Sequence, residues 1–185
     1  MKTIIGFTGK KQNGKDTASA MLKLWLEAKG YRVKIVALAD PIRNIGEILG
    51  YTERQMKYDK NEINFVTGLS FREFAQKFGT DFCRDEINPS IWINLLTKAL
   101  CRIEEDTIII FPDVRFNNEA EMIRSGNGAV FKIHRGVNDN DTHKSESGIS
   151  DELVDAQIDN DGGLHELFRM METISVLIEK GAYDE

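Results

Sequence analysis

Short apolar segments alternate with longer amphipathic segments along this chain. Four short segments have the β-branched, apolar composition of strands: residues 3–8, 32–38, 107–111 and 129–134. A fifth short strand is expected at residues 157–159. Six longer segments place apolar residues at helical spacing: residues 15–29, 40–49, 71–86, 91–104, 117–124 and 164–178. Residues 51–69 and 136–156 are polar, which is typical of loops.

This alternation predicts an α/β protein in which helices cover both faces of a parallel sheet. Right-handed crossover connections then give a three-layer α/β/α arrangement. A length of 185 residues favours a single domain over residues 1–185.

A glycine-rich loop joins the first strand to the first helix. Residues 9–15, Gly-Lys-Lys-Gln-Asn-Gly-Lys, match the P-loop pattern G-x-x-x-x-G-K in the strand–loop–helix context that the pattern requires. Backbone N–H groups of such a loop, together with the helix N-terminus, attract phosphate. We therefore predict a nucleoside triphosphate site, with the Lys15 ammonium at the β- and γ-phosphates. Its residues are Gly9, Lys10, Asn13, Gly14, Lys15, Asp16 and Thr17.

Asp16 stands where the pattern has a Ser or Thr that binds Mg²⁺. Three roles are open for this pair of residues. Asp16 holds Mg²⁺ through water, Thr17 binds the α-phosphate, or Asp16 only favours the helix N-terminus. The sequence contains no guanine-reading N-K-x-D motif, which disfavours a GTPase.

A second candidate anchor follows the apolar segment 107–111. Asp113 would lie near the loop if this strand neighbours the first, and it could hold Mg²⁺ or its waters. Arg115 could address phosphate from the same strand end. The structural alternative is that Asp113 caps the next helix and Arg115 pairs with Glu119.

Six motifs, taken in order, resemble those of the deoxynucleoside monophosphate kinases of tailed bacteriophages. They are Gly9–Thr17, Leu38–Pro41, Gly79–Asp81 with Arg84 and Trp92, Asp113–Ala120, Thr142–Glu146 and Ile158–Gly162. The resemblance covers nearly the whole chain. It implies the P-loop nucleoside monophosphate kinase fold, with MgATP as donor and a deoxynucleoside 5′-monophosphate (dNMP) as acceptor.

The resemblance also implies a layout, which agrees with the order of the segments. The five strands would be ordered 2-3-1-4-5. The helices of about 40–104 would form an acceptor-binding insert, and about 136–156 would form a short lid. Asn160 and Gly162, after the last strand, would lie near the donor base.

The acceptor needs cations for its phosphate and a flat apolar surface for its base. Arg43, Arg72, Arg84 and Arg115 are the candidate cations, and Arg84 and Arg115 are favoured. For the arginines other than Arg115, the alternative is a surface position. Trp92 is the ring that we expect at the base. Asp40 could bond the sugar or base, although capping the helix that begins with Pro41 suits it equally well.

The predicted lid differs from that of larger nucleoside monophosphate kinases, because it contains no arginine. Arg135 stands immediately before it, and Lys144 is its long cation. We expect His143, Lys144 and Glu146 to contact substrate, with a surface position as the alternative for His143. The predicted catalytic set is Lys15, Asp113, Arg115 and Arg135, with Asp16 and Asp113 holding Mg²⁺ through water.

Charge and hydropathy narrow the class of partner. The net charge of −6 disfavours nucleic acid binding, although residues 1–35 carry eight basic residues against two acidic ones. No apolar run approaches 18 residues, so we expect no membrane span and a cytoplasmic protein, in the host cytoplasm if its source is a phage. Cys83 and Cys101 are expected as free, packed thiols. A monomer and a homodimer remain equally open.

The expected function is therefore transfer of the γ-phosphoryl group of ATP to a dNMP. One alternative is a P-loop kinase for another small phosphorylated acceptor, of the phosphomevalonate or dephospho-coenzyme A type. Another is a non-catalytic module that binds nucleotide. Preference for one base depends on pocket shape, which the sequence does not give.

Overall fold

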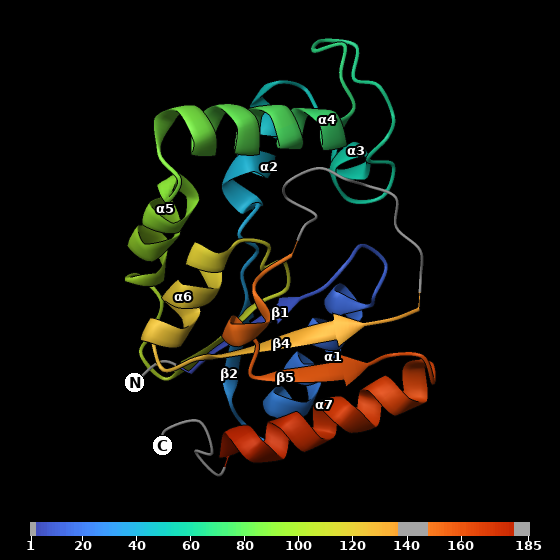
Figure 1. The fold of residues 1–185 in the computed structure, drawn as a ribbon, viewed down its shortest axis with the longest axis vertical. Helices are drawn as coiled ribbons and strands as arrows, with labels where there is room; N and C mark the ends of the chain where they lie inside the picture. Colours follow the sequence, from blue (N-terminus) through green and yellow to red (C-terminus); the bar gives the residue numbers. More distant parts are fainter. Residues whose placement is uncertain (1–2, 137–147, 180–185) are drawn as a thin grey trace. The chain divides into compact units, whose positions relative to one another are not determined.

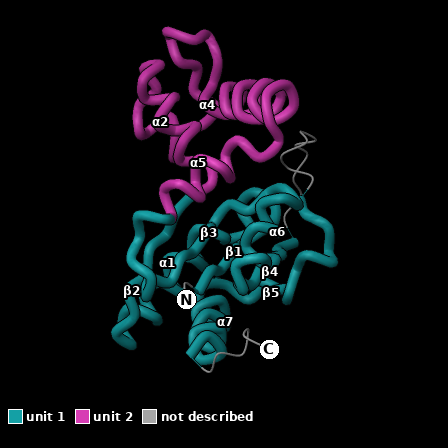
Figure 2. Tube along the Cα trace, turned by 90° about the vertical axis from the view of Figure 1, so that its left-hand side faces the viewer, with its two compact units in different colours: residues 1–37, 101–142, 146–185 teal, residues 38–100, 143–145 magenta. Residues whose placement is uncertain are grey.

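The structure is a computed structural model that describes residues 3–136 and 148–179. The chain divides into two compact units, coloured separately in Figure 2. The sheet unit contains the described residues of 3–37, 101–136 and 148–179, and the helical unit is Leu38–Leu100. The helical unit closely matches the range 40–104, where we expected an insert. Its acceptor-binding role stays a prediction.

The sheet unit is built on five parallel strands in the order β2-β3-β1-β4-β5 (Figure 1). The predicted order is thereby confirmed. The strands are β1 (Ile4–Thr8), β2 (Arg32–Ile35), β3 (Thr107–Phe111), β4 (Ala129–His134) and β5 (Ala156–Asp159). The helices of this unit are α1 (Lys15–Ala28), α6 (Asn117–Ser125) and α7 (Leu164–Glu179), with a 3₁₀ turn η3 (Asp151–Leu153) before β5.

Helices cover both faces of this sheet. Ile5 and Phe7 of β1 point into a core shared with α1 and α7. Successive side chains of a strand point to opposite faces, so Gly6 faces the other side. A Cβ at Gly6 would press on Ile123 of α6. The three-layer α/β/α arrangement follows, as the apolar central strands β1, β3 and β4 predict.

The helical unit contains four helical segments around an aromatic core. They are α2 (Asp40–Ile48), α3 (Glu53–Lys57), α4 (Phe71–Phe74), which continues as the π-helix η1 (Ala75–Ile87), and α5 (Ile91–Leu100). The core consists of Ile42, Tyr51, Met56, Phe71, Phe74, Cys83 and Trp92. Burial raises the pKa of the Cys83 thiol. Cys101, in contrast, is exposed, so only one of the two thiols is packed as expected.

Several predicted element boundaries are wrong. The strand predicted to reach residue 38 ends at Ile35, and the helix predicted to reach residue 104 ends at Leu100. Helix α3 lies in the segment 51–69, where we expected only loop. Its capping box, Thr52 with Gln55, is the sequence signal that the prediction overlooked.

One finer prediction in the helical unit is also wrong. Asp40 is the first helical residue of α2 and not its N-cap, which is Ala39. Phe82 is half exposed and not part of the core. The spacing of Phe71, Phe74, Phe78 and Phe82 suits one face of an α-helix. The wider turn of the π-helix η1 instead leaves Phe82 outside, while Phe78 still packs against the core.

Candidate active site

The glycine-rich loop lies between the end of β1 and the start of α1. Gly9 and Gly14 have φ angles of +134° and +97°, in a region that glycine tolerates best. A Cβ at Gly9 would collide with the carbonyl oxygen of Ile133, so the loop packs tightly against β4. The Lys15 Nζ donates to the carbonyl oxygens of Gly9 at 2.6 Å and Lys10 at 2.7 Å. The lysine therefore folds back over the loop.

A cavity of about 390 Å³ opens over this loop within the sheet unit. Six of the residues predicted to bind ATP or act in catalysis line it: Gly14, Lys15, Asp16, Thr17, Arg135 and Asn160. Arg135 comes from the end of β4 and Asn160 from the end of β5. Carboxyl ends of parallel strands meet at one edge of the sheet, which brings these distant residues together.

The cavity also has walls that the prediction missed, namely Gln12, Gly163, Leu164 and Leu167. Leu167 belongs to the apolar face of α7 and is part of the core as well. The sequence pattern indicates that face but not that its first turn borders a cavity. Gly9, Lys10, Asn13 and Gly162 do not line the cavity, although they were predicted with the same site.

Two asparagines fasten the loop to the sheet. The buried Asn13 side chain donates its Nδ2 to the carbonyl oxygen of Ile133 at 2.9 Å. The buried Asn160 side chain donates its Nδ2 to the carbonyl oxygen of Asn13 at 2.8 Å. The main-chain N–H of Asn160 donates to the carbonyl oxygen of His134 at 2.7 Å.

Gly162 lies in the turn between β5 and α7. A Cβ at this position would overlap the carboxylate of Glu166. Glu166 is exposed and its carboxylate is the end of a flexible side chain, so this contact alone does not require a glycine at position 162.

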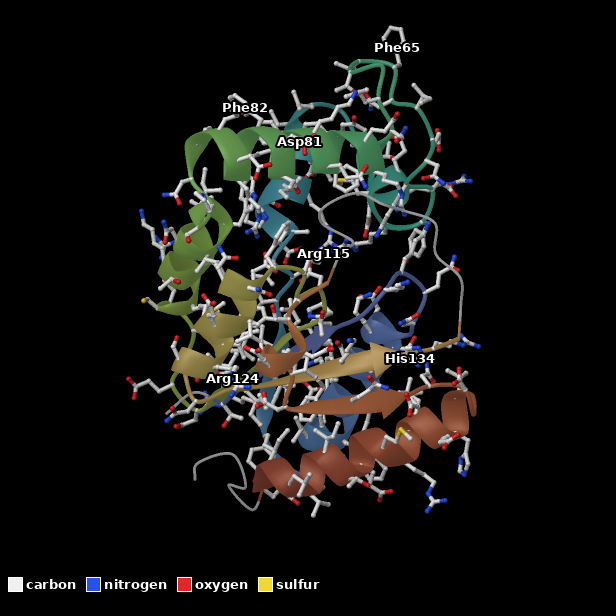
Figure 3. The ribbon with its side chains drawn as sticks, in the orientation of Figure 1. Phe65, Asp81, Phe82, Arg115, Arg124 and His134 are labelled. Atoms are coloured by element: carbon white, nitrogen blue, oxygen red, sulfur yellow. The ribbon has the colours of Figure 1, made fainter. Side chains whose placement is uncertain are left out.

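Asp113 and Arg115 follow β3 in the sheet unit. The N–H of Val114, between them, donates to the carbonyl oxygen of Phe7 at 3.0 Å, which places this segment beside the end of β1. Figure 3 labels Arg115 in this region. The phosphate loop starts from the same strand end, so Asp113 lies on the predicted side of the sheet.

The alternative role for Asp113, as cap of the next helix, is wrong. The N-cap residue of α6 is Phe116. The buried Glu119 carboxylate closes the turn by accepting from the N–H groups of Arg115 at 2.8 Å and Phe116 at 3.2 Å. A main-chain hydrogen bond thus joins Arg115 to Glu119, the residue with which we expected it to pair.

The three arginines of the helical unit that were predicted to bind the acceptor each have a polar partner within that unit. Arg43 pairs with Asp40 at 2.6 Å. Arg72 donates its Nε to Asn61 Oδ1 at 3.2 Å. The Arg84 side chain is buried and donates an Nη1 hydrogen to the carbonyl oxygen of Pro89 at 3.1 Å.

The prediction that the Trp92 ring faces a base is not supported. Trp92 is only 2% exposed and belongs to the core of the helical unit. Its Nε1 donates to the carbonyl oxygen of Gly79 at 2.8 Å. The apolar face of α5 carries the ring inward. His143, Lys144 and Glu146 lie outside the described residues.

The described residues contain no cluster of three or more His, Cys, Asp or Glu side chains suited to a metal. Mg²⁺ in nucleotide sites often uses one or two carboxylates, with waters and phosphates as its other ligands. Asp16 at the cavity and Asp113 at the neighbouring strand end fit that kind of donor set. No helix in the part of the chain that the structure describes is long and apolar enough to cross a bilayer.

The sequence profile of the deoxynucleotide monophosphate kinases matches residues 48–171 of this chain. The chain belongs to this family. The matched range begins after the phosphate loop, so the family match does not depend on the loop motif. It contains Arg84, Asp113, Arg115, Arg135 and Asn160.

Relatives of the chain are viral. A protein of Acanthamoeba polyphaga mimivirus, provisionally named a deoxynucleotide monophosphate kinase, is 30% identical over 77% of this chain and 80% of its own length. The deoxynucleotide monophosphate kinase of Enterobacteria phage T4 is 32% identical over 62% of this chain and 49% of its own. The deoxynucleoside-5′-monophosphate kinase of Escherichia phage T5 is 28% identical over 50% of this chain and 40% of its own. This family member thus matches half or less of each of these two phage proteins.

Solved structures confirm the fold class. Dephospho-CoA kinase of Campylobacter jejuni superposes with a TM-score of 0.54 at 12% identity, covering 98% of this chain and 100% of its own. APS kinase of Mycobacterium tuberculosis, in complex with AMPPNP and APS, also reaches 0.54 at 11% identity, covering 96% and 98%. At such identities the likeness concerns the fold alone.

Proposed function

We propose that this chain transfers the γ-phosphoryl group of ATP to a dNMP, giving ADP and a dNDP. The observation that carries the proposal is the cavity over the phosphate loop, which Lys15 and Arg135 both line. Family membership supports a deoxynucleotide as the acceptor. Since the relatives are viral, we place the reaction in the cytoplasm of an infected host.

In this proposal ATP binds with its triphosphate over the loop. Lys15 exchanges its two loop carbonyls for β- and γ-phosphate oxygens. Arg135 approaches the transferring group from the end of β4 and offsets charge on its equatorial oxygens. The acceptor needs no general base, because a phosphate oxygen is already a nucleophile. The γ-phosphorus–oxygen bond to ADP breaks as the bond to the dNMP oxygen forms.

Mg²⁺ would be held through water by Asp16 and Asp113, with the phosphates as its other ligands. It would neutralise charge on the β- and γ-phosphates. Asp16 lines the cavity and stands in the first turn of α1, so the metal role and the helix N-terminus role suit it equally. Thr17, which also lines the cavity, is the candidate for the α-phosphate.

For the acceptor we keep Arg115 with Arg84 as the leading phosphate-binding residues, and Asp40, Arg43 and Arg72 as further candidates. His143, Lys144 and Glu146 remain proposed substrate contacts on sequence grounds. Trp92 is withdrawn as the base platform, because its ring and its N–H are both engaged in the core.

A coupled assay for ADP release tests this function with a panel of acceptors. The panel holds the four common dNMPs, the matching ribonucleotides, dephospho-coenzyme A, phosphomevalonate and no acceptor. We expect Mg²⁺-dependent release that requires a dNMP. Turnover with dephospho-coenzyme A or phosphomevalonate alone would replace this proposal with the related-kinase alternative. ADP release independent of every acceptor would favour the nucleotide-binding module.

A further inference from the structure

Hydrogen bonds from the side chains of two asparagines, Asn13 and Asn160, hold the phosphate loop to the ends of β4 and β5. Asn13 belongs to the loop, and Asn160 begins the turn between β5 and α7. The two residues are 147 positions apart in the sequence, yet the Asn160 side chain reaches the main chain of Asn13. Both side chains are buried, and buried hydrogen bonds of this kind are costly to lose.

Three hydrogen bonds form a continuous link around the loop. Ile133 of β4 accepts from the Asn13 side chain, and Asn13 accepts from the Asn160 side chain. The Asn160 N–H returns to His134, the last residue of β4. One side of the loop is thus held to two strands without any contribution from bound nucleotide.

The bond from Asn160 fixes the direction of one peptide group in the loop. A peptide unit is planar and trans, so its carbonyl and its N–H point in opposite directions. Holding the Asn13 carbonyl therefore also fixes the N–H of Gly14, which lines the cavity. Inward-pointing N–H groups are what such a loop offers to phosphate.

Gly14 leaves the space that this arrangement needs. A Cβ at Gly14 would come within 2.5 Å of Asn160 Nδ2. Glycine is therefore favoured at position 14 for two reasons. It leaves room for the Asn160 side chain, and it tolerates the positive φ of 97°. This contact couples the second glycine of the loop to Asn160, the residue that follows the edge strand β5.

We infer that Asn160 is a positioning residue for the phosphate loop. It acts through the Asn13 carbonyl, and its effect falls on the triphosphate of the donor. This refines our expectation that Asn160 lies near the donor base. The inference rests on the proposed ATP site but not on the identity of the acceptor.

Two fragments of ATP, bound separately to the full chain, distinguish a role of Asn160 in positioning the phosphate loop from a role in contacting the nucleoside. Inorganic tripolyphosphate reports on the loop alone, and adenosine reports on the base and ribose alone. Loss of one buried hydrogen bond in Asn160→Ala should weaken tripolyphosphate binding about 5- to 10-fold, with adenosine binding unchanged. The KM for ATP should rise by a similar factor, while the KM for the dNMP stays the same.

A matched control is Gln157→Ala, which removes a neutral amide three positions earlier. The exposed Gln157 donates to Asp159 within β5 and does not line the cavity. It should bind both fragments as the wild type does. If Asn160→Ala melts below the assay temperature, Asn160→Ser removes the long donor with a smaller loss of polarity, and the same comparison applies.

Two results would overturn the inference. One is weaker adenosine binding with unchanged tripolyphosphate binding, which would make Asn160 a nucleoside contact. The other is wild-type affinity for both fragments in the variant. Failure of the proposed function looks different, because the chain would then not phosphorylate dNMPs while the tripolyphosphate difference persisted.

Discussion

At the scale of single residues, Lys15 and Arg135 supply positive charge at the cavity over the phosphate loop. In the structure Lys15 is engaged with carbonyl oxygens of its own loop. Arg135 is placed by the end of β4 and lies next to Gly136, whose N–H donates to Asp161 Oδ1 at 3.0 Å. The strand end and the β5–α7 turn therefore hold the backbone beside this arginine in place.

Arg135→Ala should lower kcat about 100-fold, because a fixed cation that stabilises transition-state charge is worth that much. Arg135→Lys should recover part of the loss, since lysine keeps the charge but not the planar fork. Steady-state kinetics with saturating ATP and dNMP measure both variants. The exposed Arg169 of α7, outside the cavity, is the matched control, and Arg169→Ala should leave kcat unchanged. Equal kcat values for Arg135→Ala and wild type would remove Arg135 from the catalytic set.

At the scale of elements, the segment between α3 and α4 is an ordered loop with an apolar tip. Phe65 is 98% exposed, and Figure 3 shows it at the outer end of the loop. The buried Asn64 beside it holds the loop together. Its Nδ2 donates to Gly50 O at 2.8 Å, and its Oδ1 accepts from the N–H groups of Val66 at 2.9 Å and Thr67 at 3.1 Å.

Replacing Asn64 with alanine should therefore lower the free energy of unfolding by about 1–3 kcal/mol, because it removes three hydrogen bonds that a buried side chain makes to the main chain. Phe65→Ala should change it by less than about 0.5 kcal/mol, since the ring touches little that folding buries. Urea unfolding curves of the two variants provide the comparison. A larger effect at Phe65 than at Asn64 would contradict this account of the loop.

The start of α4 shows how a local motif can give a helix a pH-dependent contribution to stability. Ser70 and Glu73 form a capping box, and the Ser70 N–H, followed by its hydroxyl, lowers the pKa of the Glu73 carboxyl. Because the pKa is lower in the folded state, the Glu73 carboxylate stabilises the fold at pH values above the ordinary glutamate pKa. That contribution disappears as the pH falls through the lowered pKa. The box is visible in the sequence as Ser-x-x-Glu, although we predicted the helix from periodicity alone.

At the scale of the whole molecule, the sheet was predictable because its three central strands, β3, β1 and β4, are almost entirely buried. The segments 107–111 and 129–134 match β3 and β4 residue for residue. The segment 32–38 was predicted too long. Its apolar residues Val36–Leu38 continue the strand pattern, but β2 ends at Ile35 and the helical unit begins at Leu38. Apolar composition does not reveal where a chain leaves a sheet.

The site was predictable where a sequence pattern has few explanations other than ligand binding. The glycine-lysine loop and the polar residues at strand ends are of this kind, and Lys15, Arg135 and Asn160 do line one cavity. Trp92 was not predictable, because an aromatic residue in an amphipathic helix suits a core and a binding surface equally. Leu164 and Leu167 were missed for the same reason. The hydrogen bond from Asn160 to Asn13 joins residues 147 positions apart, which no local sequence pattern indicates.

The central claim is that the γ-phosphoryl group of ATP ends on a dNMP. The most direct test incubates the chain with γ-³²P-labelled ATP, Mg²⁺ and each dNMP, and separates the labelled products by chromatography. We predict that label appears in a dNDP with the wild type and that Lys15→Ala, folded by circular dichroism, forms none. Label released only as inorganic phosphate, or equal transfer by Lys15→Ala, would contradict the account.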